Sequence, residues 1–102
     1  MKNLSVNPQT LTSFSKKYHI SAIWVFGSTL RDEVTNDSDI DLVVEFTFDA
    51  KPTLLTLASM EADLEKIYNR KVDLITRGAI DEFMNPILKQ EVLSTMVQVY
   101  GS

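Results

Sequence analysis

The sequence predicts an α/β (α+β) protein, a small mixed β-sheet with helices packed against it. Segments with helical spacing of apolar residues alternate along the chain with short runs rich in β-branched residues, and this order is typical of such folds. The chain has 102 residues, of which 44% are hydrophobic. A single domain over residues 1–102 is therefore expected.

Two early segments carry clear helix signals. Asn7 followed by Pro8 matches an N-cap and a first helical residue, so a helix is expected over about 8–18. Thr53 can cap a second helix over about 54–68. Its expected apolar stripe consists of Leu54, Leu57, Ala58, Leu64, Ile67 and Tyr68.

A third helical region follows near residue 80. Apolar spacing predicts one or two turns, and Asn85-Pro86 then restarts or kinks the helix. The expected apolar residues of this region are Ile80, Phe83, Met84, Ile87, Leu88 and Val92.

Four segments are expected to form strands: 20–26, 39–46, 71–75 and 95–100. A short helical turn over 28–31 is expected between the first two. Along 39–46, Asp39, Asp41, Val43 and Glu45 share one face, and the residues between them share the other, which is expected to face the core. The residues on this predicted core face are Ile40, Leu42, Val44 and Phe46.

Composition excludes several classes of function. The chain has 10 basic and 14 acidic residues, a net charge of −4, which argues against direct nucleic-acid binding. It contains no cysteine, so no disulfide or thiolate metal site is possible. No apolar stretch reaches membrane-spanning length and no signal peptide is recognisable, so a cytoplasmic protein without membrane contact is expected.

Three carboxylates are the candidate metal ligands. Asp39 and Asp41 lie two residues apart at the start of a strand and therefore on the same face. If the 71–75 strand is its neighbour, Asp73 can join them. Grouped carboxylates favour a hard cation such as Mg²⁺ or Mn²⁺. The alternative is that all three are solvated surface residues.

Gly27-Ser28, separated from Asp39 by ten residues, is a candidate phosphate-binding turn. The alternative is an ordinary strand-to-helix turn with serine as a cap. Arg31 is placed to reach a phosphate, or to pair with nearby acids such as Asp37. Arg77 is a second, weaker candidate of the same kind.

The remaining candidates have structural interpretations. His19, the only histidine, is expected at the end of the first helix, where a cation is favourable. Trp24 and Phe26 are expected to be core residues rather than base-stacking ones.

Together these motifs resemble the minimal nucleotidyltransferase (MNT) domain of the DNA polymerase β-like superfamily. Gly27, Ser28, Asp39, Asp41 and Asp73 match the family pattern in type, order and spacing. The resemblance covers nearly the whole chain and implies a polymerase β-like nucleotidyltransferase fold. One departure is that Asp32 follows Arg31 where members often carry glycine.

The resemblance also implies a function. Family members of this size are mostly MntA-type antitoxins that transfer AMP from ATP to a tyrosine of a HEPN ribonuclease toxin. By analogy, Asp39, Asp41 and Asp73 are the expected catalytic residues and ligands of two Mg²⁺ ions. Gly27, Ser28 and Arg31 are the expected ATP-binding residues. A different expectation is a non-catalytic antitoxin that neutralises its toxin by binding and masking it.

Overall fold

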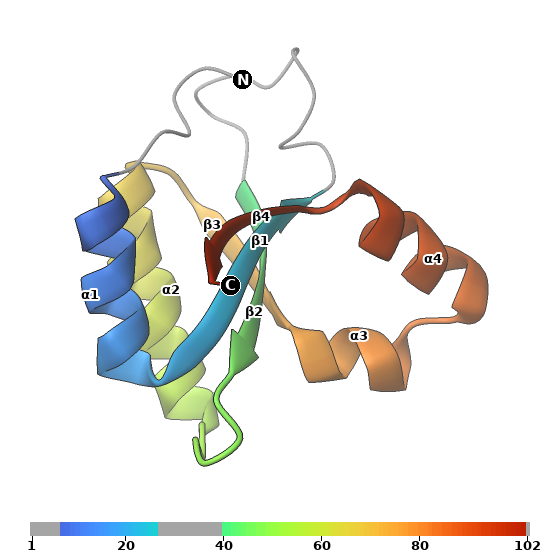
Figure 1. The fold of residues 1–102 in the computed structure, drawn as a ribbon, viewed down its shortest axis with the longest axis horizontal. Coiled ribbons are helices and arrows are strands. Elements are labelled where there is room, and N and C mark those ends of the chain that lie inside the picture. The colour runs from blue at the N-terminus through green and yellow to red at the C-terminus, as the bar shows by residue number, and fades with distance from the viewer. Residues whose placement is uncertain (1–6, 27–39, 102) are drawn as a thin grey trace.

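The computed structural model describes residues 7–26 and 40–101. A sheet lies between two helical layers (Figure 1), which confirms the expected mixed α/β architecture. Along the chain the elements are α1 (Pro8–Tyr18), β1 (Ile20–Phe26), β2 (Ile40–Phe46), α2 (Leu54–Tyr68), β3 (Val72–Thr76), α3 (Arg77–Phe83), α4 (Pro86–Thr95) and β4 (Val97–Gly101). The turn expected over 28–31 lies outside the described residues.

The strand order in the sheet is β3-β2-β1-β4. β1 pairs antiparallel with both β2 and β4, whereas β2 and β3 are parallel. Parallel neighbours need a long crossover connection, and α2 provides it. The strand order places the two acidic strands side by side.

Side-chain caps explain why the helices begin where the sequence predicts. The Asn7 side chain accepts a hydrogen bond from the Gln9 amide at 2.8 Å. Thr53 and Thr56 form a reciprocal capping box at the start of α2. The Asn85 side chain accepts from the Leu88 amide at 2.8 Å, so Asn85-Pro86 starts the separate helix α4.

Two helices end on residues in the left-handed region. His19 has φ 59° and donates its amide to the Ser15 carbonyl, and Asn69 has φ 56° and donates to the Glu65 carbonyl. These residues terminate α1 and α2 in the conformation usually taken by glycine at this position. The structure therefore gives His19 a backbone role in helix termination.

Apolar side chains fill both faces of the sheet. The larger core lies under α1 and α2 and contains Ile40, Leu42 and Val44, with Phe46 packed at its margin. The second core lies under α3 and α4 and is built on Val43, Ile80 and Val92. The sequence predicted only the first core, because Val43 shares its strand face with two polar residues, Asp41 and Glu45, and its full burial is not evident from that pattern.

The stripe predicted for α2 is partly wrong. Leu54 is 86% exposed and Ala58 is exposed, whereas Met60, absent from the prediction, is fully buried. Leu57, Leu64, Ile67 and Tyr68 do pack into the larger core. The first turn of α2 extends past the sheet, so a residue with the correct period there has nothing to pack against.

Of the apolar residues predicted for the last helical region, only some are buried. Ile80 and Val92 are buried and Met84 is partly buried, but Phe83, Ile87 and Leu88 are exposed. No described helix is long and apolar enough to cross a membrane.

Ser15 offers a test of the packing between α1 and the sheet. Its hydroxyl is buried and has no hydrogen-bond partner among the described residues. An unsatisfied buried hydroxyl is costly and alanine is the better helix former, so Ser15→Ala is expected to raise the free energy of unfolding by about 1 kcal/mol. Urea denaturation measures the change. Ser13→Ala, at an exposed position of the same helix, is the control and should gain less; equal gains would exclude burial as the cause.

Candidate functional site

The parallel pairing of β2 and β3 brings two of the predicted carboxylates together. Asp41 is the register partner of Asp73, as Val43 is of Ile75. Partners on neighbouring strands lie about 4.8 Å apart and project from the same face. Asp73 is exposed and Asp41 is partly exposed. The two side chains therefore lie next to each other at the amino ends of their strands.

The face that carries these carboxylates is the one covered further along by α3 and α4. Val43 and Ile75, one step along the strands, pack against the second core. α3 begins at Arg77, beyond the carboxyl end of β3, so it covers that end of the sheet. The amino ends of β2 and β3, where Asp41 and Asp73 lie, are not covered by α3 (Figure 1).

The carboxyl end of β1 lies at the same end of the sheet as these two carboxylates. Phe26, the last residue of β1, is the register partner of Asp41. The chain passes from Phe26 directly into Gly27-Ser28. Four predicted site residues, Gly27, Ser28, Arg31 and Asp39, lie outside the described residues, so the structure gives no geometry for them.

The donor chemistry of the described pair fits a hard divalent cation. Asp41 and Asp73 offer carboxylate oxygens only, and adjacent negative charges favour a bound cation. Within residues 7–26 and 40–101, no three His, Cys, Asp or Glu side chains gather as a metal site. The third predicted ligand, Asp39, falls outside those ranges.

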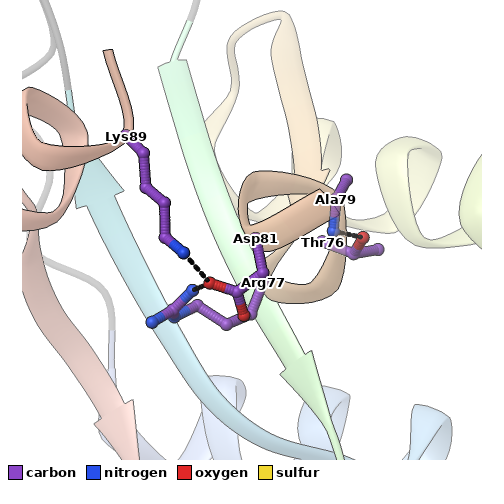
Figure 2. A network of polar contacts seen from close by, with 5 residues as sticks. All are labelled: Thr76, Arg77, Ala79, Asp81 and Lys89. Carbon is purple, nitrogen blue, oxygen red and sulfur yellow. Dashed lines mark hydrogen bonds and ion pairs between the residues drawn. The ribbon is translucent and has the colours of Figure 1, made fainter. Parts of the chain in front are cut away.

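Arg77 lies away from the carboxylate pair. Its guanidinium contacts Asp81 at 2.7 Å, and the Lys89 ammonium contacts the same Asp81 oxygen at 3.0 Å (Figure 2). Hydrogen bonds from Arg77 and Lys89 lower the pKa of the Asp81 carboxyl. Of the two roles considered for Arg77, the structure favours ion pairing. Sequence reasoning missed Asp81, although its i,i+4 spacing from Arg77 was a usable signal.

The two aromatic residues of β1 belong to the second core. Trp24 and Phe26 are both partly buried and pack against the cluster of Val43, Ile80 and Val92. Their core assignment from sequence is confirmed. Phe26 was not identified beforehand as the neighbour of Asp41, because strand register cannot be read from a single strand.

Comparison with known families identifies the domain type. Residues 8–97 match the family model described as nucleotidyltransferase domain. A protein from Methanocaldococcus jannaschii named as a protein adenylyltransferase is 37% identical over 97% of this chain and 100% of its own length. Protein adenylyltransferase MntA from Thermococcus cleftensis is 31% identical over 76% of this chain and 77% of its own length.

Solved structures share the fold. A toxin–antitoxin structure with AMP-PNP aligns with a TM-score of 0.69 and 19% identity, covering 95% of this chain and 75% of that one. A tri-AMPylated Shewanella oneidensis HEPN toxin in complex with an MNT antitoxin aligns with a TM-score of 0.61 and 18% identity, covering 93% and 70% respectively. At these identities the likeness concerns the fold.

Proposed function

The chain belongs to the nucleotidyltransferase domain family, and on that premise we propose that it is a Mg²⁺-dependent protein adenylyltransferase that acts as an antitoxin. The proposed reaction moves AMP from ATP to a tyrosine of a HEPN-type toxin. The observation that carries the proposal is the pairing of Asp41 with Asp73 at the amino ends of β2 and β3, which α3 does not cover.

In the proposed reaction, the tyrosine oxygen forms a bond to the α-phosphorus of ATP. The bond from that phosphorus to the bridging oxygen breaks, and pyrophosphate leaves. Asp73, the more exposed carboxylate, accepts the hydroxyl proton. Gly27 and Ser28 would bind the triphosphate, with Arg31 as a further phosphate ligand.

The same carboxylates, together with Asp39, would hold the metal, and two ions are proposed. When bound, Mg²⁺ would neutralise phosphate charge and stabilise the attacking and leaving oxygens. The role of the protein is to place Asp41 and Asp73 on adjacent strands so that both can bind from one side. Because the donor is ATP, the reaction is assigned to the cytoplasm.

The partner assignment draws on the proteins that this chain resembles. One solved neighbour of the same fold is an MNT antitoxin bound to an AMPylated HEPN toxin. A protein acceptor also agrees with the small size of the chain, since its partner can supply the remaining walls of the active site. We therefore propose that the acceptor is a HEPN-type protein.

Radiolabelled ATP tests the proposal directly. Label in the α-phosphate is expected to appear on the HEPN protein when the two proteins are mixed with Mg²⁺, whereas label in the γ-phosphate is not. EDTA should abolish the transfer. Incorporation from the γ-phosphate would indicate phosphorylation instead, and no incorporation from either position would refute adenylyl transfer.

Masking without catalysis is the second candidate. The exposed Phe83 and Ile87 side chains favour it, since large apolar residues in contact with solvent are typical of binding surfaces. If masking is the mechanism, the toxin is neutralised stoichiometrically without ATP and recovered unmodified. If transfer is the mechanism, the toxin stays inactive after the antitoxin has been removed.

A further inference from the structure

We propose that the junction of α3 and α4 is the docking surface for the acceptor protein. This surface, called the α3–α4 tip, consists of Phe83, Ile87 and Leu88. The inference rests on the proposed function, because it names where the protein substrate of that reaction binds.

The tip exposes three large apolar side chains. Phe83 is 79% exposed, Ile87 is 84% exposed and Leu88 is 44% exposed, all within six consecutive residues. Their spacing predicts a buried helical stripe, yet within the described chain they stay uncovered. A cluster of large apolar side chains that is exposed to solvent is typical of a protein-binding site.

The tip lies on the correct side of the sheet for an acceptor. Ile80 from α3 and Val92 from α4 pack on Val43, so both helices cover the face from which Asp41 and Asp73 also project. α4 then returns toward the catalytic edge, because β4 begins at Val97, the register partner of Val25. The carboxyl end of α4 thus leads back toward the end of the sheet that carries the carboxylates (Figure 1).

The distance between the α3–α4 tip and the carboxylates is small enough for one bound protein to contact both. Three strand residues from Asp73 to Thr76 span roughly 10 Å, and the seven residues of α3 add about 10 Å. A typical interface of about 800 Å² per partner is roughly 30 Å across. An acceptor seated on the tip can therefore place a tyrosine at the carboxylates.

An ion-pair cluster holds the tip in shape. Asp81 on α3 contacts Arg77 on the same helix and Lys89 on α4, as Figure 2 shows. Lys89 belongs to the same helix as Ile87 and Leu88, and Asp81 lies two residues before Phe83. These contacts limit the relative movement of the two helices, so the apolar side chains are presented together.

A second exposed apolar group provides the matched control. Leu54 is 86% exposed and Leu55 is 77% exposed, so their exposure is similar to that of Phe83 and Ile87. They belong to α2, which packs on the opposite face of the sheet. An acceptor positioned over Asp41 and Asp73 would not contact that face.

The test compares Phe83→Ser/Ile87→Ser with Leu54→Ser/Leu55→Ser, using the HEPN-type acceptor of the proposed reaction. The tip variant is expected to raise the KM for the acceptor on the order of ten-fold or more, since two central interface residues are removed, with kcat and the Kd for ATP unchanged. The α2 variant should match the unmodified protein. Thermal melts confirm that both variants remain folded.

Calorimetric binding of the acceptor without ATP separates this inference from the proposed function. If the unmodified chain binds the acceptor but transfers no AMP, the function fails while the docking prediction still applies. Unchanged acceptor affinity in the tip variant, or an equal loss in the α2 variant, would overturn the docking surface. Ile87→Lys is a second variant and should weaken binding further by placing a charge in the interface.

Discussion

Combining Asp39→Asn with Asp41→Asn is expected to reduce adenylyl transfer by several orders of magnitude while the fold stays as stable or becomes slightly more stable. Both changes keep side-chain shape and remove charge. Loss of the carboxylates removes the proposed metal ligands, whose ions would stabilise charge in the transition state. Relief of repulsion between Asp41 and its neighbour Asp73 accounts for the unchanged or higher stability. Labelled-ATP transfer and chemical denaturation measure the two quantities.

Glu45→Gln is the matched control for that experiment. Glu45 lies on β2 on the same face as Asp41, and it is exposed near the opposite end of the strand. Its substitution removes one carboxylate charge from the same strand face but should leave transfer unchanged. A double variant that still modifies the acceptor at a near-normal rate would contradict the catalytic assignment. A variant that no longer modifies the toxin but still neutralises it would support masking.

Leu64→Ala is expected to lower the free energy of unfolding by about 2–5 kcal/mol, because it removes a fully buried side chain and leaves a cavity. In a domain of this size each kcal/mol shifts the Tm by roughly 4–8 °C. Differential scanning calorimetry measures the shift. Leu54→Ala is the control on the same helix: this leucine is 86% exposed, so the change should be within about 0.5 kcal/mol.

Similar losses from the two leucine variants would mean that α2 is packed differently from the structure described. A small loss from Leu64→Ala alone would mean that the larger core can close around the missing side chain. The two leucines have the same chemistry and lie in one helix, so the difference between the variants reports burial rather than helix propensity.

Local signals accounted for much of the secondary structure. Capping by Asn7, Thr53 and Asn85 depends on residues within three positions, so the start of each of these helices could be predicted from sequence. The alternation of side chains along β2 likewise predicted which of its residues enter the larger core. β3 begins and ends one residue later than expected, a difference typical of element boundaries.

The sequence identified the residues of the candidate site, but it predicted their proximity only on the condition that their strands are neighbours. Residue types and spacing identified Asp41 and Asp73, but their adjacency depended on which strands pair. The parallel register between β2 and β3 supplies that pairing. The roles of Asp39, Gly27 and Ser28 remain predictions from the sequence.

The sequence alone determined which segments form helices and strands and which side chains share a face of each, because capping and periodicity act over a few residues. Tertiary structure alone decided what covers each face. Phe83 and Ile87 share the period of buried residues but stay exposed, whereas Val43, which shares its strand face with Asp41 and Glu45, is fully buried under α3 and α4. Periodicity tells which side chains share a face of an element, and burial depends on whether another part of the chain reaches that face.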